Sequence, residues 1–96
     1  MSAIVTLDAD VKEGKKDELL TLLSQYLPET RNYKGFISIS IHTEKNKSHV
    51  LFYEKWESVK DYESYLQWRT EIGVMKTLGA TFSSPPLIRY FSIDDV

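Results

Sequence analysis

Phe52-Tyr53-Glu54-Lys55-Trp56-Glu57-Ser58 carries a strand pattern directly into the start of a helix. Successive side chains of a strand point to opposite faces of its sheet, so Glu54 and Trp56 share one face. Ser58, with Asp61 three residues later, resembles a capping box in which Asp replaces the usual Glu or Gln. The segment therefore predicts a strand that ends at Trp56 and a helix that begins directly after Ser58.

The helix after Ser58 places an arginine on its apolar side. At about 100° per residue, Arg69 lies near the centre of this side, whose members are Val59, Tyr62, Tyr65, Leu66, Arg69 and Ile72. A guanidinium keeps its charge inside a protein, so a buried arginine needs partners. Two compatible hypotheses follow. Arg69 has a structural role, either in an ion pair with Glu54 on the neighbouring strand or with its charge extending to the rim, or it faces an oxygen anion in a pocket.

Working outward from this segment, the remaining patterns complete an alternating order of strands and helices. We expect strands over 3–10, 35–43, 49–56 and 87–93, a helix over about 15–27, and a second helix from Ser58 that Gly73 interrupts before a short turn at 74–78. Pro28 lacks an amide donor, so the first helix should stop, kink or restart there, and Thr30 joins its apolar stripe if it continues. The order β-α-β-β-α-β is that of the ferredoxin-like α+β fold, a four-stranded antiparallel sheet with helices on one face.

Size and composition narrow the class of protein. The 96 residues predict one domain over 1–96, and the net charge of −2 argues against a general nucleic-acid binder. Cysteine is absent, and no apolar run approaches the roughly 20 residues of a membrane span. The N-terminus lacks the order of a signal peptide, so a cytoplasmic protein without membrane contact is expected. Because one sheet face holds the helices, the other must be covered or be polar, which favours a homodimer.

Four aromatic residues surround the second helix. Trp56 and Trp68 bracket its first three turns, and they either pack in the core or line a cavity for a flat ring. Tyr62 and Tyr65 lie one turn apart, and the same two alternatives apply to them. In a pocket, a tyrosine hydroxyl could orient a ligand oxygen or relay a proton.

Signatures of metal and cofactor sites are missing. His42 and His49 flank the predicted hairpin turn, but two histidines alone are a weak metal signal and favour a solvated or paired surface role. The glycine spacing fits neither a phosphate loop nor a dinucleotide fingerprint. No metal and no cofactor is therefore predicted.

The chain resembles the antibiotic biosynthesis monooxygenase (ABM) family of the dimeric α+β barrel superfamily over almost its whole length. The segment Tyr65 to Gly73 is similar to a subgroup described as quinol monooxygenases. The motifs that carry the resemblance to the family are Val11-Lys12-Glu13-Gly14, Thr30-Arg31 followed by Gly35-Phe36, Leu51-Phe52-Tyr53-Glu54-Lys55-Trp56-Glu57-Ser58, and Pro85-Pro86-Leu87-Ile88-Arg89-Tyr90-Phe91.

The resemblance implies a fold, a reaction and a set of site residues. It implies a homodimer whose sheets pack face to face, with a cavity between sheet and helices in each subunit. Members include oxygenases that use dioxygen on phenols, quinols or anthrones without metal or flavin. By this resemblance Trp56 would be a wall for the ring, Tyr65 a proton relay or orienting group, and Arg69 the counter-charge to a phenolate, with Tyr62 and Trp68 also binding substrate.

Two departures from the family pattern limit the function. Many members have a histidine where this chain has Tyr65, and the haem-degrading branch has an asparagine where it has Leu7. Haem degradation is therefore not expected, and the usual general base is missing. We predict a cofactor-independent monooxygenase acting on a hydroxylated aromatic. The alternatives are a non-catalytic small-molecule-binding or regulatory homodimer and an isomerase of a small carbonyl compound.

Overall fold

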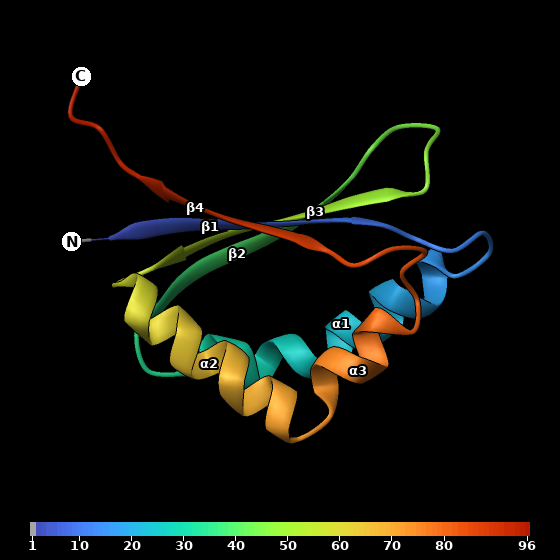
Figure 1. The fold of residues 1–96 in the computed structure, drawn as a ribbon, viewed down its shortest axis with the longest axis horizontal. Coiled ribbons are helices and arrows are strands. Elements are labelled where there is room, and N and C mark those ends of the chain that lie inside the picture. Colours follow the sequence, from blue (N-terminus) through green and yellow to red (C-terminus); the bar gives the residue numbers. More distant parts are fainter. Residues whose placement is uncertain (1) are drawn as a thin grey trace.

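The structure, a computed structural model, describes residues 2–96. Its strands and helices follow the predicted order, with one further short helix before the last strand (Figure 1). In chain order they are β1 (Ala3–Asp10), α1 (Lys16–Arg31), β2 (Phe36–Thr43), β3 (His49–Trp56), α2 (Val59–Glu71), α3 (Val74–Gly79) and β4 (Leu87–Ser92).

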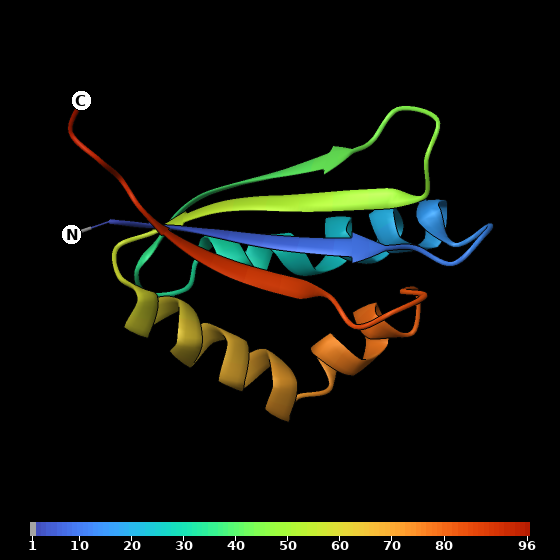
Figure 2. The same ribbon diagram turned by 45° about the horizontal axis from the view of Figure 1, so that its top comes forward.

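The four strands form one antiparallel sheet in the order β2-β3-β1-β4. Figures 1 and 2 show that all the helices lie on the same side of this sheet. The register pairs Leu7 of β1 with Phe52 of β3 and with Ile88 of β4, so these side chains share the helix-facing side. This arrangement is the ferredoxin-like α+β fold, and it confirms the predicted fold class.

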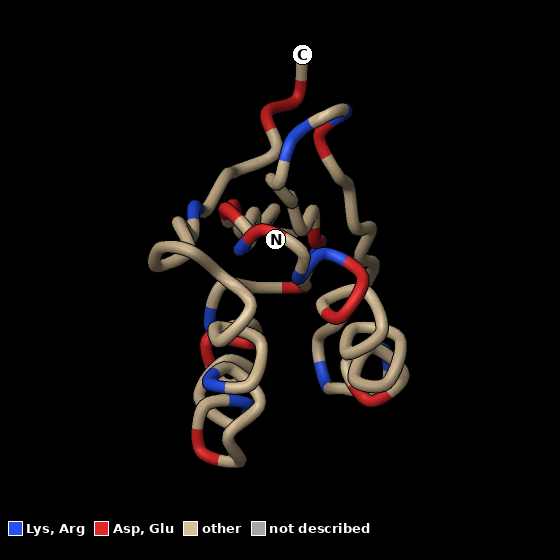
Figure 3. Tube along the Cα trace, turned by 90° about the vertical axis from the view of Figure 1, so that its right-hand side faces the viewer, with Lys and Arg blue, Asp and Glu red and all other residues tan. Residues whose placement is uncertain are grey.

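The two sheet faces differ in their cover. On the helix side, Val5 and Trp56 are fully buried. On the other side, Tyr53 and Phe91 leave 45% and 46% of their surface exposed. Acidic and basic residues are interspersed along the helices and turns (Figure 3). Among the helices of residues 2–96, none has the length and apolar character needed to span a membrane.

Helix α1 is longer than the predicted 15–27, because it passes through Pro28 and ends at Arg31. The amide that Pro28 lacks would have bonded the carbonyl of Ser24, and Ser24 is exposed, so water can take its place. The apolar stripe also extends past the proline, because Leu27 is followed by Thr30, which is fully buried. Packing of this last turn therefore outweighs the single lost hydrogen bond.

The joint between β3 and α2 has the predicted cap. The amide of Asp61 donates to Ser58 Oγ over 3.1 Å, and Ser58 Oγ donates to Asp61 Oδ2 over 2.9 Å. Gly35 packs directly beneath this cap with a φ of +87°, and a Cβ placed there would collide with the side chain of Asp61. The start of β2 and the start of α2 are thus fixed to each other.

Candidate active site

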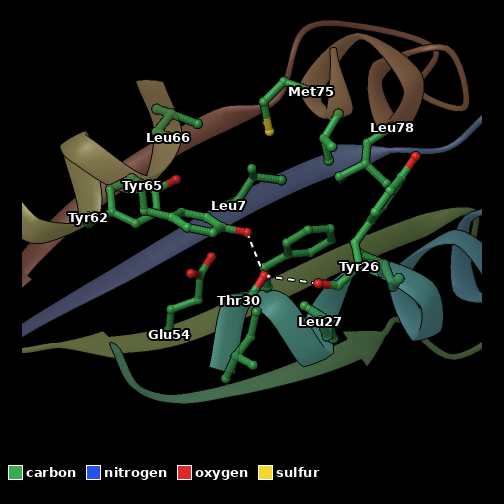
Figure 4. Close-up of a pocket in the computed structure, with 14 residues that line it drawn as sticks. Leu7, Tyr26, Leu27, Thr30, Glu54, Tyr62, Tyr65, Leu66, Met75 and Leu78 are labelled. Carbon is green, nitrogen blue, oxygen red and sulfur yellow. Dashed lines mark hydrogen bonds between the residues drawn. The ribbon is translucent and has the colours of Figure 1, made fainter. Parts of the chain in front are cut away.

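A small cavity lies between the sheet and the helices. Its volume is about 30 Å³. Its lining comes from β1 to β3 (Leu7, Ile39, Phe52, Glu54), α1 (Leu23, Tyr26, Leu27, Thr30), α2 (Tyr62, Tyr65, Leu66) and α3 (Val74, Met75, Leu78) (Figure 4). The walls are therefore mostly apolar, with a few tyrosine, threonine and carboxyl groups among them.

The cavity is too small for an aromatic ring as it stands. A space of about 30 Å³ has room for one or two water molecules, whereas pockets for drug-sized ligands measure roughly 300–1,000 Å³. Leu66 and Met75 line it and are only half-buried. Methionine adapts its shape readily. Binding a ring would require side chains such as these to move outward.

Glu54 is the acidic residue of the lining. It lies on β3, the second strand of the sheet, and only 3% of its surface is exposed. Trp56 Nε1 donates a hydrogen bond to Glu54 Oε1 over 2.9 Å. Burial raises the pKa of Glu54 to about 7, and the hydrogen bond from Trp56 opposes this shift. Near neutral pH this carboxyl group can therefore both take up and release a proton.

Arg69 is fully buried, and its partners come from α1 and from its own helix. Nη2 donates to the backbone carbonyl of Tyr26 over 2.7 Å and to Thr30 Oγ1 over 3.1 Å. Nε donates to Tyr65 Oη over 3.1 Å, and Nη1 lies 3.8 Å from a carboxylate oxygen of the exposed Glu29. The predicted ion pair with Glu54 is not formed.

Tyr65 joins this polar cluster to the cavity. Its hydroxyl oxygen lies 2.6 Å from Thr30 Oγ1, and both residues line the cavity (Figure 4). Arg69 does not line it, but its guanidinium donates to these two hydroxyl groups and to the carbonyl of Tyr26, which is also a lining residue. The guanidinium also lies over the ring of Trp68, 4.5 Å from its centroid. The position of the Tyr65 hydroxyl is therefore set from two helices.

The two tryptophans lie behind the lining. Trp56 is fully buried, with its ring centroid 5.7 Å from that of Tyr62 and 5.0 Å from that of Tyr65. Trp68 stacks on Tyr33 with centroids 5.4 Å apart. Both support the tyrosines or Arg69 and are not among the residues that line the cavity.

Of the predicted site residues, the structure therefore brings Tyr62 and Tyr65 to the cavity and sets Trp56, Trp68 and Arg69 behind it. Sequence reasoning missed Thr30 and Glu54 as lining residues. The available signal for Glu54 was its place between Phe52 and Trp56 on the helix-facing side of β3. For Thr30, it was a position on the apolar stripe.

The histidines belong to the surface near the hairpin. His49 bonds Asp10 through Nδ1 over 2.8 Å and Asp8 through Nε2 over 2.7 Å. Hydrogen bonds that His49 donates to the carboxylates of Asp10 and then Asp8 raise its pKa above the usual 6.5. His42 pairs with Ser40 over 2.7 Å. The paired surface role expected for these residues matches this geometry.

The model of the antibiotic biosynthesis monooxygenase family matches residues 2–70, which include the strands β1 to β3 and nearly all of α2. The chain belongs to this family. The match supports a monooxygenase-type function for the ABM chain described here. No curated protein matches the chain significantly.

Solved structures share the fold at low sequence identity. A conserved protein from Methanosarcina mazei Go1 has a TM-score of 0.85 and 17% identity, with 95% of this chain and 91% of that chain covered. Rv0793 from Mycobacterium tuberculosis has a TM-score of 0.85 and 14% identity, covering 100% and 98%. The ActVA-Orf6 monooxygenase of Streptomyces coelicolor, in complex with Nanaomycin D, has a TM-score of 0.82 and 18% identity, covering 99% and 89%. At these identities the similarity establishes the fold.

Proposed function

We propose that this protein is a homodimeric monooxygenase of single-domain subunits that oxidises a hydroxylated aromatic with dioxygen, using neither metal nor flavin. The observation that carries the proposal is the cavity of an ABM-family fold, in which a carboxyl group and tyrosine hydroxyls are enclosed by apolar walls. An aromatic ring suits such walls, and its hydroxyl group suits the enclosed polar groups.

The reaction balances with these two substrates alone. A phenol-type ring loses its O–H hydrogen and one ring C–H hydrogen, and both leave in water. One oxygen atom of dioxygen becomes a ring carbonyl and the other becomes that water, so the ring gives four electrons and dioxygen takes four. Because the ring is the reductant, the protein has to bind it, favour its anion and exclude bulk water.

The site residues divide into those that would touch the ring and those that would hold them. Tyr62 and Tyr65 line the cavity, and Tyr65 would orient the substrate oxygen or relay a proton. Arg69 would act as a positioning residue, because its charge reaches the cavity through the hydroxyl groups of Tyr65 and Thr30. Trp56 would keep the two tyrosine rings in place.

Dimerisation would cover the open face of the sheet. That face carries several large apolar side chains with about half of their surface exposed, a pattern typical of interaction surfaces. They are Tyr53, Leu87, Phe91 and Ile93, at 45%, 49%, 46% and 50% exposure. Packing two such faces together would remove them from water.

A non-catalytic small-molecule-binding homodimer is the second candidate. The small volume of the cavity, about 30 Å³, and the tyrosine at the position of the family histidine favour it. Such a protein would bind a phenol reversibly through the same lining and leave it unchanged.

Dioxygen uptake distinguishes the two functions. Purified protein is mixed with 1-naphthol and, separately, with anthrone, and uptake is compared with the uncatalysed rate. We expect turnover, with one atom of ¹⁸O₂ in each quinone formed. The Tyr65→Phe variant should turn over more slowly, while the Thr70→Val variant, which removes an exposed hydroxyl group from the same helix, serves as the control. Saturable binding without uptake for both probes would instead establish the second candidate.

A further inference from the structure

We propose that Glu54 is the general base that removes the proton from the hydroxyl group of the substrate. This inference rests on the proposed monooxygenase function. It assigns the general base, because Tyr65 stands in this chain where many family members have a histidine.

The other ionisable groups near the cavity are poorly suited to this role. Arg69 stays charged and cannot accept a proton. The phenol group of a tyrosine is a weak acid and a poor base at neutral pH, and burial raises the pKa of Tyr62. The two histidines lie at the hairpin and bond other partners. Among the lining residues that the structure describes, Glu54 supplies the one carboxyl group.

The geometry leaves one carboxylate oxygen of Glu54 available. Oε1 accepts the hydrogen bond of Trp56 Nε1, which fixes the orientation of the group. Within residues 2–96, no donor forms a hydrogen bond with Oε2. Oε2 also keeps some accessible surface, so it is not completely enclosed. Figure 4 shows the carboxylate rising from β3 toward the rings of Tyr62 and Tyr65. A substrate hydroxyl in the opened cavity would meet this oxygen.

The groups around Glu54 set the pKa of its carboxyl group. Its neighbours in the adjacent strands are Val5 and Ile39, which carry no charge. From α2 it faces Tyr62 and Tyr65, and the charge of Arg69 stands beyond Tyr65. Burial raises the pKa of Glu54 to about 7. A general base works best when its pKa lies near the working pH.

A purely structural role for Glu54 would not require a carboxylate. The indole of Trp56 needs one acceptor, and the carbonyl oxygen of a glutamine side chain would serve. A buried carboxyl group is disfavoured relative to an amide of the same size, because its charged form loses hydration. This difference makes Glu54→Gln an informative substitution.

The proton-transfer step is balanced within the site. The substrate O–H bond breaks, its electron pair stays on the substrate oxygen, and the proton forms an O–H bond with Glu54 Oε2. A ring carbon of the resulting anion bonds one oxygen atom of dioxygen, which gives a ring peroxide anion, and Glu54 returns its proton to the outer oxygen of this peroxide. The O–O bond then breaks while the ring carbon loses its C–H proton to the departing hydroxide, so that a ring carbonyl and water form and Glu54 is again a carboxylate. The preferred substrate would carry a neutral hydroxyl group, without an anionic substituent beside it that Glu54 would repel.

The experiment compares the wild type, Glu54→Gln and the control Glu57→Gln with 1-naphthol and anthrone as probes. Glu57 is exposed, so the control removes the same charge three residues along without touching the cavity. We expect kcat to fall by about 10²–10⁴-fold in Glu54→Gln, with KM and the circular dichroism spectrum little changed. The control should keep the wild-type kcat. Unchanged kcat in a folded Glu54→Gln variant would overturn the role of Glu54 and leave the proposed function standing.

A second measurement needs only the wild type. For each probe turned over, kcat/KM should fall below an apparent pKa of about 7, because the base must be deprotonated in the free enzyme. A flat profile between about pH 5 and 8 would overturn the inference even if Glu54→Gln failed to fold. Absence of turnover of both probes by the wild type would overturn the proposed function, and this inference with it.

Discussion

The hydroxyl oxygens of Thr30 and Tyr65 lie 2.6 Å apart, and this short contact joins α1 to α2 at the edge of the cavity. Arg69 donates to both oxygens and to the carbonyl of Tyr26 one turn earlier in α1. The two helices are thus linked by a buried polar cluster rather than by apolar packing alone. Nη1 of Arg69 is buried without a hydrogen-bond partner among residues 2–96, so the contribution of the cluster depends on the bonds made by Nε and Nη2.

Replacing Thr30 with valine should destabilise the protein. Valine keeps the shape of the side chain but removes the acceptor for Arg69 and the partner of Tyr65. We expect the free energy of unfolding to fall by about 1–3 kcal/mol, measured by urea denaturation. The control is Thr70→Val, which removes an exposed hydroxyl that bonds only its own helix backbone. Equal stability of the two variants would contradict a stabilising role for the cluster.

Lysine cannot replace Arg69. Its ammonium group is a compact charge and cannot reach the Tyr65 hydroxyl on one side and the Tyr26 carbonyl on the other. Because each hydrogen bond to a charged group contributes about 1.5–3 kcal/mol, Arg69→Lys should lower the thermal midpoint clearly. The exposed Arg31→Lys should not. A wild-type melting temperature for Arg69→Lys would show that the charge suffices.

Because Gly35 packs closely against Asp61, an alanine at Gly35 should destabilise the protein more than an alanine at Gly14. Gly35→Ala meets both a positive φ and a collision, whereas Gly14→Ala meets only a positive φ, because nothing lies within 4 Å of its Cβ. The positive φ should cost each variant about 1–2 kcal/mol. Gly35→Ala should lose more than Gly14→Ala in chemical denaturation, and the reverse order would be inconsistent with this packing.

The pairing of His49 with Asp8 and Asp10 predicts a pH-dependent contribution to stability. Because folding raises the pKa of His49 above 6.5, protonation stabilises the folded state. This contribution is complete below the unfolded pKa of about 6.5 and is lost as the pH rises through the folded pKa. The stability difference between the wild type and His49→Gln should therefore shrink as the pH rises from about 5 to 9.

The control for this series is His42→Gln, because His42 bonds Ser40 rather than a carboxylate. A wild-type advantage over His49→Gln that grows with pH would contradict the sign of the predicted effect. Titration of His49 by NMR in the folded protein provides the direct measurement of its pKa.

Dimerisation through the open sheet face predicts that one charge there will separate the subunits. Phe91→Lys places an ammonium group among the exposed apolar side chains of this face, and light scattering should report half the wild-type mass. Ile72→Lys is the control, since Ile72 is 52% exposed but follows α2 on the helix side. A monomeric wild type, or a dimeric Phe91→Lys variant, would argue against this interface.

The sequence predicted the elements well where one local signal was strong. The alternation through Phe52, Glu54 and Trp56 and the Ser58 cap placed β3 and α2 correctly, because side-chain period and capping act over a few residues. The continuation of α1 past Pro28 was left open, since a proline weighs against a helix locally while burial of the following turn depends on the whole core.

The same open question explains the error at Arg69. Its acceptors, Thr30 and the Tyr26 carbonyl, lie on the part of α1 that brackets Pro28, and only a helix that continues presents them to α2. Because the sequence did not establish the last turn of α1, Glu54 on the neighbouring strand was proposed as the partner of Arg69. Glu54 was correctly placed on the same sheet face as Trp56. Whether a residue on that face borders a cavity depends on how well its neighbours fill space, which residue spacing does not encode.

The near absence of free space around Glu54 and Tyr65 has a kinetic consequence. An aromatic ligand cannot enter a cavity of about 30 Å³ until the side chain of Leu66 or Met75 moves outward. In stopped-flow mixing, the observed association rate would then level off at high ligand concentration, at the frequency with which the wall opens. The hydroxyl of Tyr65, held beforehand by Thr30 and Arg69, would need no reorientation once the ligand is inside.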